Sequence, residues 1–112
     1  MYTYSAKVIS VYDGDTITVD IDLGFKFSVR NFKIRMYGID TPEIKGSTRD
    51  RGILARDALR EKILGKDIIL HTLKDEQEKY GRWLGIVYVN GENVNNWMLT
   101  KGYAVAFMTE GS

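Results

Sequence analysis

Hydrophobic and polar residues alternate along five segments of the chain, a pattern typical of β-strands with one buried face. The pattern is clearest at residues 16–23, where every second residue is Ile, Val or Leu and the residues between are Thr or Asp. Asp13-Gly14 and Gly24 supply turns on either side of this segment. The five predicted strands are residues 4–13, 16–23, 25–39, 67–73 and 83–89.

Two other segments have the spacing of short helices. In residues 53–64, Ala, Leu and Ile recur at intervals of four, which predicts an amphipathic helix that Gly65 ends. Residues 93–103 predict a second helix, with Asn93 as its N-terminal cap and Gly102 closing it.

The order of these elements favours a small barrel. The polar segment 45–52 is predicted to be a mobile loop, and the charged segment 74–82 a second loop. Three strands, a helix, two strands and a helix within 112 residues predict one mainly-β domain, residues 1–112. We expect a closed or nearly closed five-stranded barrel of the oligonucleotide-binding (OB-fold) type, with one helix between strands three and four and a short helix after strand five.

The composition excludes several classes of protein. Hydrophobic residues make up 44% and charged residues 28%, and no apolar run approaches the ~20 residues that span a bilayer. Cysteine is absent, which excludes thiol chemistry, and the single histidine, His71, excludes a histidine pair. The N-terminus lacks the apolar core of a signal peptide, so we expect a cytoplasmic protein, unless a longer precursor carries a leader.

The charge distribution adds little by itself. The formal net charge is +1, although basic residues outnumber acidic ones by six to three between Lys45 and Lys62. Such a segment is typical of a solvated helix face. Beside a site for a polyanion it would steer the ligand electrostatically.

Acidic residues gather at two points along the chain. Asp13 and Asp15 lie at the first turn, and Asp40 and Glu43 flank the only proline, Pro42. Taken alone, each pair is explained by turn chemistry. If Asp15 and Asp40 lay ~4 Å apart, however, their repulsion would be ~4 kcal/mol at an effective dielectric constant of ~20, which favours a bound cation.

The oxygen-only character of these groups indicates which cation. Without His or Cys ligands, calcium or magnesium is favoured, and calcium tolerates irregular geometry better. Pro42 holds Thr41 in an extended conformation and donates no backbone hydrogen bond, so the Thr41 carbonyl is available as a further ligand.

Two arginines on or beside predicted strands are candidates for binding phosphate. Cleavage of a phosphodiester needs more than a carboxylate base, which supplies ~10²–10⁴-fold. Guanidinium groups stabilise the charge on phosphate oxygens. Arg35 precedes the second acidic pair on its strand, and Arg82 begins a later strand.

The motifs "DGDT", "R…GIDTPE" and "KYGR", in this order, closely resemble staphylococcal nuclease-like (thermonuclease, TNase-like) domains of the short phage and bacterial type. The resemblance runs from about Val8 to Phe107. Each motif is weak by itself, but the ordered set is specific.

The resemblance implies a role for each residue of the motifs. Calcium is expected at Asp15, Asp40 and the Thr41 carbonyl, although magnesium or manganese could occupy the same oxygens. Glu43 is expected to be the base that activates water. The implied phosphate-binding residues are Arg35 and Arg82.

The resemblance also implies substrate contacts. Lys79, Tyr80 and Phe107 match positions that contact the nucleotide, and Asp13 matches a carboxylate near the metal. Members of the family cleave single-stranded or frayed DNA and RNA and leave 3′-phosphates. The expected partners are therefore DNA and RNA, with no membrane, for a monomeric enzyme.

This sequence departs from the staphylococcal pattern in three places. The hairpin over residues 20–32 is longer, and the chain stops before the C-terminal helix of the staphylococcal enzyme. Phe107 occupies the position of one pocket tyrosine of that enzyme, and the position of a second falls near Thr109. The alternative function is a non-catalytic barrel that binds nucleic acid or protein. Retention of the predicted metal ligands, base and arginines argues against this alternative.

One geometric requirement can be stated in advance. Arg35 and Asp40 are five residues apart, so in a straight strand they would face opposite sides and lie ~16 Å apart. They can serve one phosphate only if the strand bends sharply. We predict that bend at Gly38.

Overall fold

The alternating segments form a sheet that closes on itself in the computed structural model, which describes residues 2–77 and 82–107. Within these residues the strands are β1 (Tyr2–Asp13), β2 (Thr16–Gly24), β3 (Phe27–Met36), β4 (Ile39–Asp40), β5 (Asp67–Gln77), β6 (Trp83–Val89), β7 (Glu92–Asn93) and β8 (Val105–Ala106). The helices are a 3-10 turn, η1 (Gly46–Thr48), and two α-helices, α1 (Arg49–Ile63) and α2 (Val94–Thr100).

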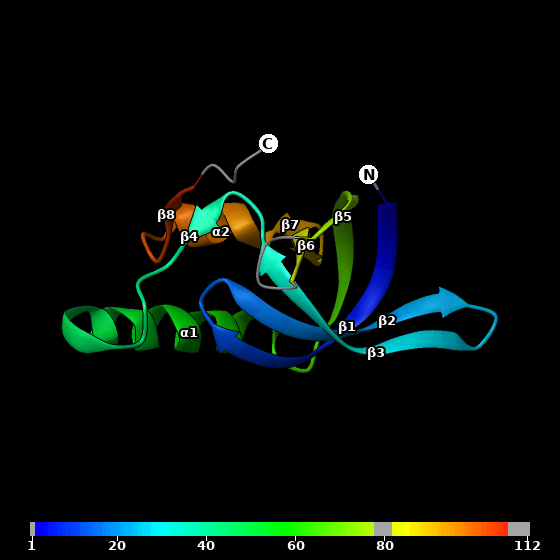
Figure 1. Ribbon diagram of the computed structural model, residues 1–112, viewed down its shortest axis with the longest axis horizontal. Helices are drawn as coiled ribbons and strands as arrows, with labels where there is room; N and C mark the ends of the chain where they lie inside the picture. The colour runs from blue at the N-terminus through cyan, green and yellow to red at the C-terminus, as the bar shows by residue number, and fades with distance from the viewer. Residues whose placement is uncertain (1, 78–81, 108–112) are drawn as a thin grey trace.

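Five of the described strands close into a barrel, as predicted. Antiparallel pairing gives the order β3-β2-β1-β5-β6, and a parallel pairing of β3 with β6 closes the ring. β7 extends this sheet beyond β6, while β4 and β8 form a separate two-stranded ladder beside α2 (Figure 1). The β2–β3 hairpin projects from the barrel on the side away from α1 (Figure 1).

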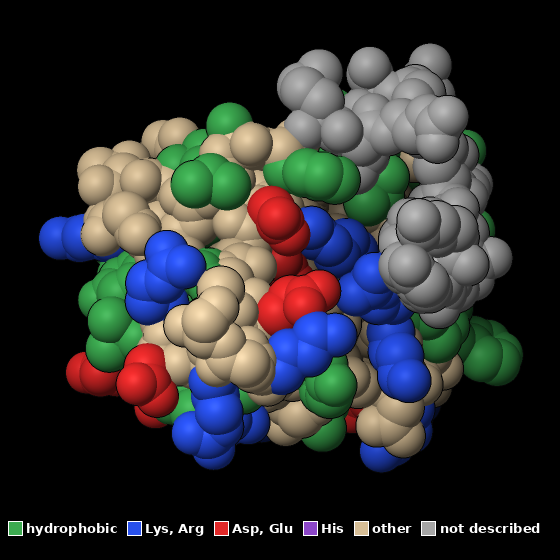
Figure 2. All heavy atoms as spheres, turned by 60° about the vertical axis from the view of Figure 1, so that its left-hand side comes forward, with side chains coloured by type: hydrophobic (Ala, Val, Ile, Leu, Met, Phe, Trp, Pro, Cys, Tyr) green, Lys and Arg blue, Asp and Glu red, His purple; other side chains and the backbone are tan. Residues whose placement is uncertain are grey.

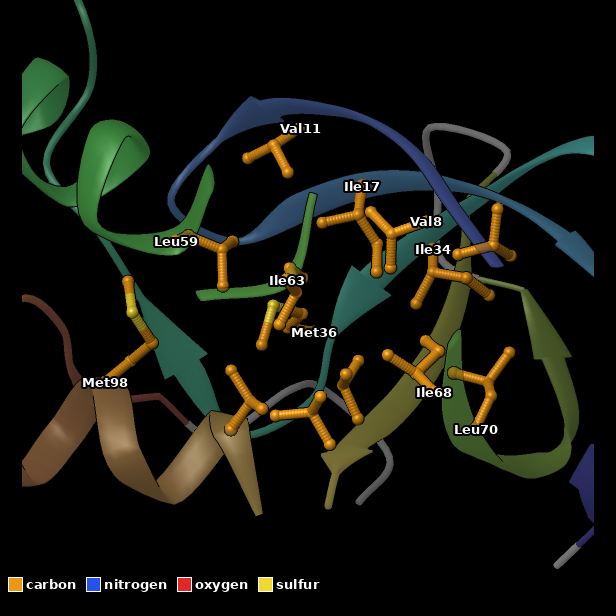
Figure 3. Close-up of a cluster of buried hydrophobic side chains, with 14 of the residues drawn as sticks. Val8, Val11, Ile17, Ile34, Met36, Leu59, Ile63, Ile68, Leu70 and Met98 are labelled. Carbon is orange, nitrogen blue, oxygen red and sulfur yellow. The ribbon is translucent and has the colours of Figure 1, made fainter. Parts of the chain in front are cut away.

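The barrel interior is filled by the apolar faces of the strands and of both helices. Figure 3 shows side chains from β1, β2, β3 and β5 meeting Leu59 and Ile63 of α1 and Met98 of α2. The apolar positions of α1 that recur at intervals of four, including Leu59 and Ile63, are 0% exposed. The apolar face of β2 continues past this core, because Leu23 at its end is 49% exposed.

The ends of both helices follow the predicted capping residues. The Asn93 side chain accepts a hydrogen bond of 2.9 Å from the Asn96 amide, which caps α2. Gly65 has φ +74° just after α1, a left-handed conformation that favours glycine. No helix in residues 2–77 and 82–107 is long and apolar enough to cross a membrane.

Several predicted boundaries are wrong. The strand predicted over residues 25–39 is shorter, because β3 runs only from Phe27 to Met36, with turns at residues 25–26 and 37–38. Residues 45–52 are not a mobile loop, because they include η1 and the first turn of α1. Gly52, a poor helix former, concealed this turn; a Cβ there would lie 2.7 Å from the Pro42 carbonyl oxygen and 2.8 Å from that of Glu43. The second predicted loop begins later than residue 74, because β5 continues to Gln77, which pairs with Trp83.

Candidate functional site

A sharp bend follows β3, as predicted. Gly38 has φ +80°, and the chain turns there into β4. The bend brings Asp40 back to the strand it left, so that Arg35 Nη2 lies 3.4 Å from Asp40 Oδ1. Residues that are five apart in the sequence therefore share one site.

A buried amide of α2 holds this bend in place. Asn95 is 5% exposed, and its Nδ2 donates to the carbonyl oxygens of Tyr37, at 2.9 Å, and Gly85, at 3.1 Å. Its Oδ1 accepts from the Val87 amide at 3.0 Å. The sequence analysis missed this residue, because nothing in the pattern distinguishes it from the neighbouring asparagines of the segment "NVNNW".

Asp15 connects the first hairpin turn to the loop after β4. It is 6% exposed, and its Oδ2 accepts hydrogen bonds from the Thr41 amide, at 3.0 Å, and the Thr41 hydroxyl, at 3.1 Å. The approach is close enough to require Gly14, because a Cβ there would lie 2.7 Å from Thr41 Cγ2 and 2.9 Å from Ala55 Cβ. The two acidic segments therefore converge.

Arg35 lies between the two converging carboxylates. Its Nη2 is 3.5 Å from Asp15 Oδ2 and 3.4 Å from Asp40 Oδ1. Nη1 donates to the Met36 carbonyl oxygen at 2.9 Å, and the guanidinium carbon is 5.7 Å from the centre of the Phe107 ring. The repulsion between the two acids is thus offset by a guanidinium, so it does not by itself require a metal ion.

A threonine hydroxyl links the second arginine to the same carboxylate. Arg82 Nη1 donates to Thr16 Oγ1 at 3.0 Å, and this hydroxyl donates to Asp15 Oδ1 at 3.2 Å. Thr16 was not predicted as a site residue, although it is the last residue of "DGDT". Both arginines are therefore held, directly or through one hydroxyl, by Asp15.

Glu43 stands apart from this network, on the exposed rim. Its side chain is 71% exposed, and its Oε2 lies 3.4 Å from Lys45 Nζ. The Thr48 hydroxyl donates to the Glu43 carbonyl oxygen at 2.7 Å, which fixes the backbone there. Its carboxylate is thus open to water.

Burial and neighbouring carboxylates raise the pKa values of two acidic residues of the site. Burial, then a side-chain hydrogen bond and the charge of Asp15, raise the pKa of Asp13 from 3.8 to about 6, against hydrogen bonds from the Asp15 and Thr16 amides. Burial and the charge of Asp15 also raise the pKa of Asp40, while Arg35 lowers it and Glu43 raises it further. Both carboxyl groups therefore hold a proton more readily than an exposed carboxyl group does.

The donor set fits the expected divalent cation by its chemistry. Within the described ranges, no three Asp, Glu, His or Cys side chains form a group that could hold a metal ion. The expected set needs only two carboxylates, Asp15 and Asp40, and the Thr41 carbonyl. Hard oxygen ligands of this kind suit calcium. Arg35 Nη2 lies within 3.5 Å of both carboxylates, which shows that the two carboxylates are close enough to contact one positive charge.

Of the remaining predicted substrate contacts, Phe107 lies in the described residues and two others do not. Phe107 lies beside Arg35 and is 43% exposed, so its ring borders the site. Lys79 and Tyr80 lie outside the described residues. Figure 2 shows acidic side chains near the centre of one face with basic side chains on both sides of them, an arrangement suited to an anionic ligand.

Residues 33–112 match the family described as "Staphylococcal nuclease homologue". The matched range covers more than half of the chain, and the chain belongs to this family. Asp15 precedes the matched range, and its hydrogen bonds to Thr41 join it to the matched residues.

Several curated proteins are similar over most of the chain. "Thermonuclease" of Staphylococcus hyicus is 36% identical over 103 residues, which cover 89% of this chain and 57% of that protein. "Protein ParB" of Escherichia coli is 36% identical over 116 residues, covering 94% of this chain and 58% of that protein. "Staphylococcal-like nuclease CAN1" of Arabidopsis thaliana is 40% identical over 75 residues, covering 67% of this chain and 22% of that protein. The chain thus spans less than two thirds of each of these relatives.

Proposed function

We propose that the protein hydrolyses phosphodiester bonds of single-stranded or frayed DNA and RNA, with calcium as its cofactor and 3′-phosphates as products. The observation that carries the proposal is the convergence of Arg35, Asp15 and Asp40, with Arg82 joined through Thr16. Membership in the nuclease family supports the same reading.

Each arginine has a distinct part in binding the phosphate. Guanidinium groups stabilise charge on phosphate oxygens best when they are oriented before the substrate arrives. The carboxylates of Asp15 and Asp40 orient Arg35, and Thr16 orients Arg82. Removing one such oriented donor typically costs an enzyme about 10²–10³-fold in kcat.

Glu43 is the proposed base. Its exposed ion pair with Lys45 is worth at most about 1 kcal/mol, so the carboxylate is readily released toward a water molecule. Glu43 takes a proton from that water as the water oxygen bonds to phosphorus. The bond from phosphorus to the 5′-oxygen breaks, and the leaving oxygen takes a proton from solvent, which leaves a 3′-phosphate and a 5′-hydroxyl.

The cofactor would be held by Asp15, Asp40 and the Thr41 carbonyl. When bound, calcium would supply charge that neutralises the phosphate and orients it. Magnesium or manganese would use the same oxygens. The protein is proposed to act as a monomer.

Digestion of heat-denatured DNA and RNA tests the proposal. We expect degradation with calcium, none with chelator, and a loss of about 10²–10⁴-fold in kcat for Glu43→Gln. Lys45→Gln is the matched control, because it removes the partner of Glu43 and leaves the base, and it should keep wild-type activity. Equal degradation with calcium, with chelator and by Glu43→Gln would overturn the proposal, and binding of nucleic acid without hydrolysis would favour the non-catalytic alternative.

A further inference from the structure

The tip of the β2–β3 hairpin carries apolar side chains that the described fold leaves in solvent. We call residues 22–33 the arm; Figure 1 shows it projecting from the barrel. Leu23 is 49% exposed, Phe25 is 93% exposed and Phe27 is 69% exposed. A group of large apolar side chains at one projecting tip is typical of a binding surface rather than of a folding core.

The backbone of the tip is also unfavourable for its sequence. Gly24 pairs with Phe27, so Phe25 and Lys26 form the two-residue turn, with φ +54° and +66°. Such turns favour Asn-Gly, because both residues are left-handed. The β6–β7 turn of this chain uses that pair, with Asn90 at φ +50° and Gly91 at +79°.

This contrast indicates what the tip is for. A bulky residue in the left-handed region costs about 1 kcal/mol or more relative to glycine. The chain retains Phe25 and Lys26 at positions where it elsewhere uses the favourable pair. Their side chains are therefore useful at the tip for something other than stability.

The charge of the arm identifies the chemistry of its partner. Residues 23–39 contain Lys26, Arg30, Lys33 and Arg35, and no acidic residue. Two acids, Asp20 and Asp22, lie on the opposing strand, where they accept backbone hydrogen bonds from Asn31 at 2.9 Å and Gly24 at 2.8 Å. Basic residues thus recur along this segment from the tip to the site, with no acidic residue between them, a charge distribution complementary to a polyanion.

We propose that the arm binds single-stranded nucleic acid several nucleotides away from the cleaved bond, with bases stacking on Phe25 and Phe27 and phosphates contacting the basic residues of β3. This inference rests on the proposed function. Eight residues separate Phe27 from Arg35, which at ~3.3 Å per residue is ~26 Å. A stacked strand spans that distance with about eight nucleotides at 3.4 Å each.

A second copy of the chain fits the arm less well. In the described residues β3 pairs with β6 only from Ile34 to Met36, so the stretch from 27 to 33 is open to a further strand. Antiparallel pairing of two such edges would bring the basic residues of the two copies together, which is destabilising. A membrane would engage the apolar tip, but the basic residues continue along β3 to the site instead of gathering at the tip.

Binding measurements with strands of two lengths test the proposal. All variants carry Glu43→Gln to prevent cleavage, and fluorescence anisotropy follows oligothymidylates of about four and about 16 nucleotides. We expect Phe25→Ser/Phe27→Ser to weaken binding of the longer strand by about 30-fold or more, since base–aromatic stacking typically contributes 1–3 kcal/mol per base and the variant removes two rings. Binding of the shorter strand should not change.

A matched control removes exposed apolar side chains elsewhere. Leu54 and Leu64, which are 61% and 45% exposed, lie on α1 and just after it, so Leu54→Ser/Leu64→Ser should bind both strands as the parent does. Equal affinity of the arm variant and its parent for the longer strand would overturn the proposal. Binding to phosphatidylglycerol vesicles tests the membrane alternative, and an arm variant that loses only its binding to these vesicles would also overturn the proposal.

The failure of this inference can be told from failure of the proposed function. With Glu43 intact, the arm variant should still hydrolyse short strands. If it does so and binds long strands as the wild-type protein does, the arm inference alone is wrong. If the wild-type protein hydrolyses nothing, the proposed function is wrong.

Discussion

β3 joins two regions of opposite character. At its Arg35 end, two charged residues are buried and paired: Arg35 is 8% exposed and Asp15 6% exposed, and the guanidinium contacts the carboxylates of Asp15 and Asp40. At its Phe27 end, apolar groups are exposed, with Phe25 at 93%. Both arrangements are costly unless something compensates.

The compensation differs between the two regions. In the first, it is internal, because Asp15, Thr16 and Thr41 satisfy one another and the arginines. In the second, it must come from outside the described chain. This difference agrees with the two proposals, a first region that holds its groups in place for hydrolysis and a second that receives a nucleic acid.

The largest expected effect lies at the rigid end. Arg35→Lys keeps the charge but cannot contact Asp15, Asp40 and the Met36 carbonyl in the same way, so we expect kcat to fall by about 10²–10³-fold. Steady-state hydrolysis of denatured DNA measures the change. Arg56→Lys, on α1, is the control and should keep wild-type kcat; a similar loss in both variants would remove Arg35 from its proposed role.

A structural residue beneath the site comes next. Asn95→Ala removes three hydrogen bonds, among them the side-chain acceptor of the buried Val87 amide, so it should lower the free energy of unfolding by about 2–4 kcal/mol. Urea denaturation gives this value. Asn95→Asp keeps the acceptor for Val87 but loses both donors, and it should also be strongly destabilised. Wild-type stability in either variant would contradict the role of Asn95 in holding the bend.

Substitution of one glycine in each region compares the two regions directly. At Gly14 a methyl group would overlap Thr41 and Ala55, so Gly14→Ala should cost about 1–3 kcal/mol in stability and reduce activity as well. At Gly24 nothing lies within 4 Å, but φ is +79°, so Gly24→Ala should cost about 1–2 kcal/mol with hydrolysis of short strands unchanged. Thermal unfolding and hydrolysis assays separate the two. Loss of short-strand activity in Gly24→Ala, or none in Gly14→Ala, would contradict the division.

The smallest expected effect is a gain. Replacing Phe25-Lys26 by Asn-Gly gives the turn its preferred residues and should raise the free energy of unfolding by about 0.5–1 kcal/mol. The same change should weaken binding of the longer oligonucleotide. Lower stability in urea would show that the tip is not a strained turn.

Much of the fold follows from periodicity, because each strand and helix buries one face against a single core. The barrel, both helices and the cap at Asn93 are confirmed. The start of α1 could not be predicted, because glycine is a poor helix former and Gly52 lies in the first turn. Gly52 fits there because the Pro42 and Glu43 carbonyls, which lie earlier in the chain, approach it closely in the fold. Spacing along the chain does not reveal such approaches.

The residues of the site could be predicted from the sequence, but several contacts between them could not. A bend at Gly38 follows from chain geometry if Arg35 and Asp40 serve one phosphate, and the structure contains that bend. The sequence analysis does not place Arg35 between Asp15 and Asp40, because it assigns the offset of the two negative charges to a bound metal cation. Thr16 and Asn95 act through contacts across the fold that no local pattern marks.

Calcium titration by calorimetry tests the central claim most directly, because it does not depend on activity. Asp40 is 51% exposed at its side chain and can be changed to Asn with little risk to folding, and Asp22 on the arm provides the matched acidic control. We predict saturable binding by the wild-type protein and by Asp22→Asn, and loss of that binding in Asp40→Asn. Equal affinity for calcium in all three proteins would contradict a cation site at Asp15, Asp40 and Thr41.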